Sequence, residues 1–459
     1  MKIRKYLALA LSVLFLCAGC GRTAAPEDTA PSDFVGTEEI SETESPREEI
    51  VIKMAMHTSL SQEITNAVRA FNEADNGYKI EYVDYDEYDD ADSYTSDGAL
   101  LPGGRSKADF ELQMDILKGD TVHIVPDTAF GDEGKFDILK EKGAFIDLYP
   151  YLDGDAQINR DTLDSHVLEL CETDGKLCYL PTFYWIESMI GKTEYVGENE
   201  GWTFAELKAR WNAMPDHATF NHQTTKYGVY WEILRSNLGA FLDYSNGTCS
   251  FDSPEFVEML EFCNSFKVIY EETEADSRNP NFVRSLMLEG FETYHRAVGS
   301  DSGEDYTLIG YPTEEGNGAF LNTNYYRYAI CADAPQEIQD GAWEFIRMLM
   351  DEDFCCDMYN KYNRLVGFPV NRVAFERLAQ EELNRPEEEQ YSHGNMTQAE
   401  YDRLCAYIES IDTMNDLIDD DLENIVNEEI DRLFNGKCTA QQCADMIQSR
   451  AAIYIAERS

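Results

Sequence analysis

Basic residues are few in this sequence. Its 459 residues include 37 lysines and arginines against 88 aspartates and glutamates, which gives a formal net charge of −51. Because such a surface repels polyanions, neither nucleic acid nor anionic lipid headgroups are expected partners. The acidic residues are spread along the whole chain, so they indicate solubility at an exposed surface rather than a particular charged ligand.

Motifs of catalysis and of cofactor binding are missing as well. The sequence contains no GxSxG, HExxH, P-loop or GxGxxG pattern. With 88 acidic residues, some pair of carboxylates would lie at glycosidase spacing by chance, so acidic pairs carry no weight. Beyond Cys20 there is no CxxC pair and no cysteine group with zinc spacing to histidine. The sequence therefore predicts a protein that is not an enzyme and holds neither metal nor cofactor.

The N-terminus has the features of a secretory leader. A basic start precedes a short apolar run from Leu7 to Phe15, and small residues precede Cys20. The run is too short for a transmembrane helix, which needs about 20 apolar residues, so residues 1–19 are predicted to be a signal peptide. The small residues before Cys20 resemble the lipobox of bacterial lipoproteins, although Cys17 stands where Leu or Val is usual. We expect Cys20 to be acylated, placing the protein outside the cytoplasm and anchored to the cell membrane; the alternative is a plain secreted protein.

The segment that follows the leader cannot form a core. Between Gly21 and Glu49 there are nine acidic residues, two arginines and almost no large apolar side chains. Such a segment cannot offset its ordering entropy and is extended by its like charges, so residues 20–49 are predicted to be a disordered linker. The remaining residues, roughly 410 of them, are too many for one compact core and enough for two lobes.

The first part of the body alternates strands with helices. Residues 50–56, 78–83 and 122–125 are predicted strands. Helical spacing predicts two intervening helices with these buried faces: Ile64, Ala67, Val68 and Phe71 on the first, and Phe110, Met114 and Leu117 on the second, over 107–118. This alternation indicates a largely parallel sheet covered on both faces. Ligands of such sheets bind beyond the carboxyl ends of the strands, which makes Thr58 and Asp127 candidate contacts.

Later elements are marked by their caps and their apolar faces. Thr203 and Glu206 form a capping box that begins a helix, and Pro335 leads a helix over 336–350. From residue 396 onward the chain is predicted to be helical. The last helix carries one apolar face, made of Cys443, Met446, Ile447, Ala451 and Tyr454.

Two further features leave alternatives open. Cys171 and Cys178 flank the turn-forming pair Asp174-Gly175, which would place the thiols across a hairpin where a disulfide is one possibility. The other cysteines fit buried small apolar residues. The acidic loop over 84–104 has an aspartate spacing that invites a calcium site, but the EF-hand pattern is absent and such loops are usually solvated.

Five segments, in order, resemble a known family. They are ITNAVRAFNEADNGYKIEYVDY (64–85), FDILKEKGAFIDLYPYLDGD (136–155), DGKLCYLPTFYWIESMIGK (174–192), AICADAPQEIQDGAWEFIRMLMDED (329–353) and VGFPVNRVAFE (366–376). Together behind a lipobox, they resemble the family 1 extracellular solute-binding lipoproteins of ABC importers, which include maltose-binding protein. The acidic loop over 84–104 departs from the shared pattern, and the family's sugar-contacting residues are not fixed by sequence.

The resemblance implies an α/β fold of the two-lobe, periplasmic-binding-protein type (type II), with a cleft between lobes joined by crossing strands. One lobe would comprise 50–181 with 310–366, and the other 183–308 with 368–459. It also implies capture of a small solute, an oligosaccharide, by hinge closure, and delivery to an ABC permease by a monomeric protein. The alternatives are a surface sensor on the same fold and a glycan-processing enzyme.

Aromatic and polar residues near the implied crossings are the candidate ligand contacts. A sugar packs its apolar face on an aromatic ring while its hydroxyls bond to polar side chains. The alternatives are packing in the hinge for Trp185 and in the core for Trp231, whose preceding residues 227–230 resemble a strand of the family. With Thr58 and Asp127, the candidates are Trp185, Glu187, Trp231, Phe291, Tyr294, Asn322, Asn324, Tyr325 and Tyr326.

Overall fold

The computed structural model describes most of the chain after the predicted linker. The described residues are 49–57, 62–88, 106–131, 134–199, 201–216, 218–221, 224–243, 246–267, 280–299, 305–313, 318–362, 364–386, 394–414 and 420–458. All of them belong to one compact unit, Glu48–Ser459. The predicted signal peptide, Cys20, nearly all of the linker, Thr58 and most of the loop over 84–104 lie outside these residues, so the expectations for them stay predictions.

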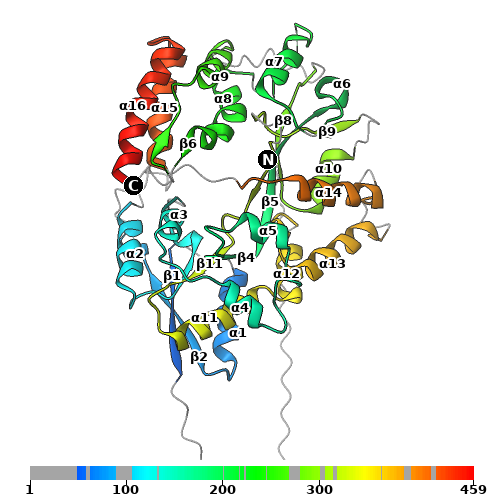
Figure 1. The fold of residues 1–459 in the computed structure, drawn as a ribbon. Helices are drawn as coiled ribbons and strands as arrows, with labels where there is room; N and C mark the ends of the chain where they lie inside the picture. The colour runs from blue at the N-terminus through cyan, green and yellow to red at the C-terminus, as the bar shows by residue number, and fades with distance from the viewer. Residues whose placement is uncertain are drawn as a thin grey trace, which may run out of the picture. The chain divides into compact units, whose positions relative to one another are not determined.

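A five-stranded sheet is built in the order β2-β1-β3-β11-β4 (Figure 1). Its strands are β1 Ile50–Met56, β2 Tyr78–Asp84, β3 Ile124–Pro126, β4 Leu180–Pro181 and β11 Arg327–Ile330. The pairs β1–β2 and β1–β3 are parallel, whereas β11 runs antiparallel to β3 and to β4. The three predicted strands therefore exist and pair in parallel, and the later part of the chain adds antiparallel strands beside them.

Two helices cover one part of this sheet. Helix α1 Gln62–Glu73 packs on β2, and helix α11 Gln336–Leu349 packs on β1 and on α1 (Figure 1). The buried face of α1 consists of the four residues predicted from their spacing, Ile64, Ala67, Val68 and Phe71. Phe71 meets Phe345 of α11 edge to face, with ring centroids 5.5 Å apart. The 3.6-residue period was therefore sufficient to orient this helix.

Helix α2 Ser106–Lys118 presents a different face to the core than its apolar spacing predicts. Phe110 and Leu117 are more than half exposed and Met114 is exposed as well. The buried residues are Ala108, Leu112 and Ile116 instead. The carboxylate of Asp109 is also buried and accepts a hydrogen bond from the backbone N–H of Gly131, 2.7 Å away. The predicted face was wrong because the helix has two apolar stripes, and the one beside the buried polar anchor is the one that packs.

The long strand β5 Phe183–Lys192 organises a second sheet. It pairs antiparallel with β8 Arg284–Leu288, β9 Tyr306–Leu308, β10 Phe320–Asn322 and β12 Phe368–Pro369. Gly367 permits the approach of β12, because its φ is +101° and a Cβ there would lie 2.4 Å from the carbonyl oxygen of Tyr184. Strand β5 thereby links segments that are far apart in sequence, and it carries two candidate ligand contacts.

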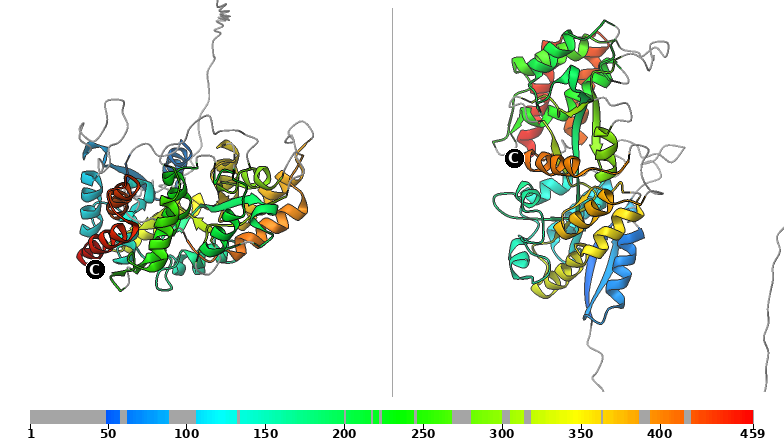
Figure 2. Two further views of the ribbon diagram at one scale, coloured as in Figure 1. Left: turned by 90° about the horizontal axis from the view of Figure 1, so that it is seen from above. Right: turned by 90° about the vertical axis from the view of Figure 1, so that its right-hand side faces the viewer.

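A second apolar core is formed mainly by helices. It contains α7 Phe204–Asn212, α8 Lys226–Ile233, α9 Pro254–Asn264, α15 Asp420–Phe434 and α16 Ala440–Arg458. Helices α15 and α16 lie side by side, with α9 against α16 (Figures 1 and 2). The predicted capping box of Thr203 and Glu206 is confirmed. The strand expected over 227–230 is wrong: these residues lie inside α8. On α16, Cys443, Ile447 and Ala451 are buried and Tyr454 is partly buried, but Met446 is exposed.

The remaining described elements are short or peripheral. They are α3 Gly134–Glu141, α4 Tyr149–Gly154, α5 Ser165–Leu170, α6 Thr193–Val196, α10 Phe291–Val298, α12 Glu352–Lys361, α13 Arg372–Leu383, α14 Gln398–Ser410, β6 Leu242–Asp243, β7 Thr248–Cys249, and the 3₁₀ turns η1 Asp86–Tyr88, η3 Asp127–Ala129 and η4 Arg235–Phe241. The predicted lobe boundaries stay a prediction.

The hairpin turn between the two cysteines is present without a disulfide. Asp174 and Gly175 have φ values of +52° and +72°, and Thr173 bridges to Lys176 across the turn. Cys171 and Cys178 are both free and buried, so the pairing that the sequence allowed is wrong. Burial raises the pKa of the Cys178 thiol. These thiols act as small apolar side chains in the core.

Two further results concern membranes and metals. None of the helices in the described part of the chain is long and apolar enough to span a membrane. Within the same residues, no group of three His, Cys, Asp or Glu side chains is placed to hold a metal ion.

Candidate ligand-binding site

Two aromatic rings form the centre of the candidate site. Trp185 comes from β5, and Tyr325 follows β10, whose residue Asn322 is the register partner of Trp185. The two rings are stacked, with centroids 6.0 Å apart and planes 16° apart, and Tyr326 meets Trp185 edge to face. Tyr325 is 58% exposed and covers a Trp185 that is only 6% exposed. An exposed aromatic face backed by a second ring is a surface on which the apolar side of a sugar can pack.

Polar groups border the aromatic pair on the same side of the sheet. Trp185 and Glu187 are two residues apart on β5, so their side chains project to the same face. One carboxylate oxygen of Glu187, Oε1, accepts hydrogen bonds from Trp185 Nε1 at 3.3 Å and from Asn322 Nδ2 at 2.8 Å. The side-chain oxygen of Asn322 in turn accepts the backbone N–H of Asn324 at 2.9 Å. The ring of Trp185 and the amide of Asn322 are therefore fixed before any ligand arrives.

The backbone of Tyr325 is held in a conformation that residues other than glycine rarely adopt. Its φ is +69°, in the left-handed region, where a residue with a Cβ is strained by roughly 1–2 kcal/mol. Its backbone N–H donates to Asp127 Oδ2 at 2.7 Å, and the same oxygen accepts from Arg327 Nε at 2.8 Å. The buried carboxylate of Asp127 thus holds the strained backbone of Tyr325 in place through a hydrogen bond. Strain of this kind persists where the surroundings over-determine it, often at functional sites.

Arg327 joins two carboxylates beneath the site. Its Nε lies 2.8 Å from Asp127 and its Nη1 lies 3.1 Å from Asp137, which also pairs with Lys140. The guanidinium stands over the ring of Phe136, 4.8 Å from its centroid. Burial raises the pKa of Asp127 against the attraction of Arg327, whereas for Asp137 the charges of Arg327 and Lys140 outweigh burial and lower the pKa. The group balances its own charge, so it supports the site as a neutral unit.

Hydrogen-bonding capacity remains in this region. Among the described residues, the buried polar atoms without a hydrogen-bond partner include Asp127 Oδ1, Arg327 Nη2 and Thr323 Oγ1. All three side chains are more than nine-tenths buried, and two of them flank Tyr325 in sequence. Because each of these atoms is itself buried, none of the three is presented at the surface where a solute would bind.

The comparisons with known proteins identify the fold. No protein-family model and no curated protein matches the sequence. Solved structures do match. An oligogalacturonide-binding protein from Yersinia enterocolitica is 14% identical, with 89% of this chain and 100% of that chain covered and a TM-score of 0.55. The sugar-binding protein MalE from Xanthomonas citri is 12% identical, with 89% and 98% covered and a TM-score of 0.54. The ABC substrate-binding protein Lmo0181 from Listeria monocytogenes is 13% identical, with 89% and 99% covered and a TM-score of 0.51.

The chain shares the fold of these solute-binding proteins. The predicted α/β, two-lobe fold class is thereby confirmed. At identities of 12–14% the likeness establishes the fold, and the ligand has to be argued from the site itself.

Within the solute-binding-protein fold, most of the predicted contacts lie together. The structure brings seven candidates into one contiguous group: Asp127, Trp185, Glu187, Asn322, Asn324, Tyr325 and Tyr326. The alternative for Trp185 was that its ring packs in the hinge. The structure agrees with the packing, because the ring is nearly buried under Tyr325. That these residues contact a ligand stays a prediction, since the structure contains no ligand.

Of the other candidates, two lie in the core, one is exposed on a helix, and a fourth is not described. Phe291 is fully buried among Tyr359, Phe368 and Phe375, and the hydroxyl of Tyr294, also fully buried, donates to a backbone carbonyl oxygen. The structure places these two rings in the core, out of reach of a solute. Trp231 is 45% exposed on α8, so its core alternative is wrong. Thr58 lies outside the described residues.

Arg327 is the residue of this candidate site that the sequence did not reveal. It stands in a strand, Arg327–Ile330, whose other members are apolar and buried. A charged residue in a buried strand is almost always paired, so its position was the available signal. The partners Asp127 and Asp137 could not be identified from the sequence, because they lie about 190–200 positions earlier in a chain with 88 acidic residues.

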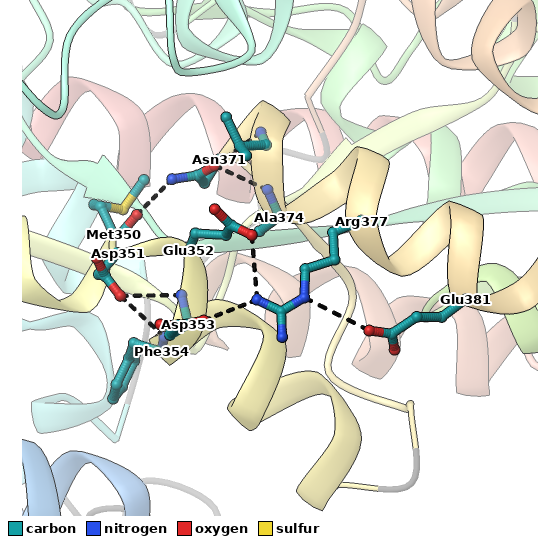
Figure 3. Close-up of polar contacts among 10 residues, drawn as sticks. Met350, Asp351, Glu352, Asp353, Phe354, Asn371, Ala374, Arg377 and Glu381 are labelled. Atoms are coloured by element: carbon teal, nitrogen blue, oxygen red, sulfur yellow. Dashed lines mark hydrogen bonds and ion pairs between the residues drawn. The ribbon is translucent and has the colours of Figure 1, made fainter.

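A concave region is lined by a different set of residues. A cavity of about 510 Å³ is bordered by the beginnings of α12 and α13 and includes Arg347, Asp351, Glu352 and Asn371. Figure 3 shows that the side chains of Asp351 and Asn371 accept hydrogen bonds from the first backbone N–H groups of their helices. Nearby, Arg377 joins Glu352 and Asp353 to Glu381 (Figure 3). The helix ends are capped from within, so this region holds α12 and α13 together and shows no feature that selects a ligand.

Proposed function

We propose that this protein captures a carbohydrate outside the cytoplasm and delivers it to an ABC importer. The observation that carries the proposal is the stacked pair of Trp185 and Tyr325, bordered by Glu187 and Asn322. An aromatic platform with fixed hydrogen-bonding groups at its edge is the arrangement that recognises a sugar ring and its hydroxyls together. The fold supports the transport role, and three structural neighbours are named for binding a sugar or a substrate.

Location and mechanism complete the proposal. The leader and Cys20 would place the protein on the outer side of the cell membrane, tethered by acyl chains and lifted by the acidic linker. Binding would favour a closed arrangement of the two lobes, because a ligand shifts the equilibrium toward the conformation that it binds better. The protein would act as a monomer toward its permease, and a sensor role on the same fold is the second candidate.

The proposal is tested by calorimetric titration of the purified protein with neutral and acidic mono-, di- and trisaccharides, amino acids and short peptides. We expect saturable binding of one carbohydrate class, weakened at least about tenfold by Tyr325→Ala, because an exposed stacking surface is lost. Phe110→Ala, which removes an equally exposed ring from α2, is the matched control and should leave the affinity unchanged. Binding of peptides or amino acids alone would reject the carbohydrate assignment.

Transport and sensing are separated in cells. Deleting the gene should abolish uptake of the radiolabelled sugar that the titration identifies if the protein serves an importer. If uptake persists while transcriptional responses to the sugar disappear, the sensor role is the correct one.

A further inference from the structure

The candidate site continues along the sheet beyond the aromatic pair. In the antiparallel ladder of β5 and β8, Glu187 lies opposite Met287, and Met189 lies opposite Ser285. Met287 is 47% exposed, and Ser285 is exposed as well. Because alternate residues share a face, Trp185, Glu187, Met287 and Ser285 form one strip. Met189 has the same face but is fully buried in the second apolar core, so on β5 the strip ends at Glu187, and β8 alone carries it on to Ser285. At roughly 3.3 Å per residue, the level of Ser285 lies about 13 Å from the level of Trp185, which is longer than one sugar ring.

Carboxylates border this strip at three places. Glu187 lies in its middle. Glu289 directly follows β8, whose last residue Leu288 pairs with Ile186, so it stands at the level of Trp185. Burial raises the pKa of Tyr326, and the charges of Tyr362 and Glu289 raise it further. Glu232, on α8, accepts hydrogen bonds from Asn221 at 3.2 Å and from the backbone N–H of Ser285. Burial raises the pKa of both Glu289 and Glu232, so each already occupies a place that disfavours negative charge.

Cations on the same face are scarce. Among the described residues of β5, β8, β10 and 322–327, lysine and arginine occur at Lys192, Arg284 and Arg327. Lys192 and Arg284 are even-numbered positions in strands whose odd-numbered residues form the strip, so they belong to the opposite face. Arg327 is nearly buried and already paired with two carboxylates. The strip therefore offers acceptors and an apolar surface, but no cation for an anionic ligand.

We infer that this site selects a neutral oligosaccharide of at least two units and rejects uronic-acid oligomers. The inference deepens the proposed function and rests on it. A carboxylate on the sugar would approach Glu187 and Glu289, and like charges brought together at a recognition site cost several kcal/mol. Neutral hydroxyls would instead donate to the same carboxylates, and charge-assisted hydrogen bonds of this kind are strong. The length of the strip favours a chain of sugars because a single ring cannot reach from Trp185 to Ser285.

The test compares trisaccharides that differ only in charge. Maltotriose, cellotriose, xylotriose and galactotriose are titrated into the purified protein, together with trigalacturonic acid and the C6-oxidised uronate of the tightest hexose trisaccharide. We expect the uronate to bind roughly a hundredfold more weakly than its neutral parent at low salt. The ratio should shrink as salt is added, because screening weakens repulsion between exposed charges. The parent monosaccharide should also bind at least about tenfold more weakly than the trisaccharide.

A charge-neutralising variant separates repulsion from the loss of a hydroxyl. Glu289→Gln should strengthen uronate binding roughly tenfold and weaken binding of the neutral trisaccharide, because a sugar hydroxyl loses its charge-assisted acceptor. Glu73→Gln, at the exposed end of α1, makes the same change in net charge as a control and should alter neither affinity. Binding of trigalacturonate in preference to every neutral trisaccharide, or equal binding of monosaccharide and trisaccharide, would overturn the inference while the proposed function stands. Binding of no sugar at all would reject both.

Discussion

Replacing Tyr325 by glycine or by alanine separates what this residue costs the fold from what it gives the site. Its φ of +69° strains any residue with a Cβ by roughly 1–2 kcal/mol. Both replacements remove the stacking on Trp185, worth about 0.5–1.5 kcal/mol. Only glycine also removes the strain, although its greater freedom in the unfolded chain takes back about 0.4–1 kcal/mol. Tyr325→Gly should therefore be more stable than Tyr325→Ala by about 1 kcal/mol, and close to the wild type.

The difference is measurable by scanning calorimetry without ligand. Unfolding entropy of about 2.1 cal/mol/K per residue, over a folded unit of about 410 residues, converts 1 kcal/mol into about 1 °C in Tm. We expect Tyr325→Gly to melt about 1 °C above Tyr325→Ala, while both lose sugar affinity to the same extent.

Two outcomes would refute this reasoning. Equal melting temperatures of the glycine and alanine variants would mean that the left-handed conformation carries no cost at this position. Unchanged sugar affinity in both variants would mean that the exposed ring is not part of the recognition surface, however strained its backbone is.

Two further predictions concern the support of the site and the anchor of the protein. Arg327→Met should destabilise the fold by about 3–5 kcal/mol, because it leaves the buried carboxylate of Asp127 without its cation. The corresponding loss in Tm is about 3–6 °C, and adding Asp127→Asn should restore part of it. A double variant that is no more stable than the single one would contradict the charge argument. Cys20→Ser should move the protein from the membrane fraction to the soluble fraction of the cells or to the medium. Immunoblotting and the incorporation of labelled palmitate would follow this change. A wild-type protein that is already soluble would show that the leader is a plain secretory signal.

Local patterns in the sequence were sufficient where one physical signal acted alone. The helix over Gln62–Glu73 has one apolar face, and the capping box of Thr203 and Glu206 satisfies backbone groups within four residues. Both were predictable because neither depends on a distant part of the chain. Helix α2 was predictable in extent but not in orientation, since a buried hydrogen bond from Gly131 to Asp109 decides which apolar stripe faces inward.

The candidate site was only partly predictable for the same reason. Trp185 and Glu187 are two residues apart on a strand, so a shared face follows from the sequence alone. Phe291 and Tyr294 are aromatic residues near a glycine, and the sequence alone does not distinguish them from the aromatic residues of the site. Only the packing of α10 against other core rings shows that their side chains are buried. Aromatic character identifies rings that could bind a sugar, whereas exposure, which depends on tertiary packing, decides between platform and core.

The buried network explains how the site can be rigid without presenting a cation to a ligand. A charge pair buried in the core contributes little net stability, because desolvation offsets the attraction between its members. Here the group of Asp127, Arg327 and Asp137 does something else: it holds Tyr325 over Trp185 without presenting a cation to the surface. An arginine exposed on the strip could have attracted acidic sugars, but Arg327 is buried and already paired with Asp127 and Asp137. Together with a net charge of −51, which slows the approach of any anion, this placement is the physical basis on which we propose a neutral glycan as the ligand.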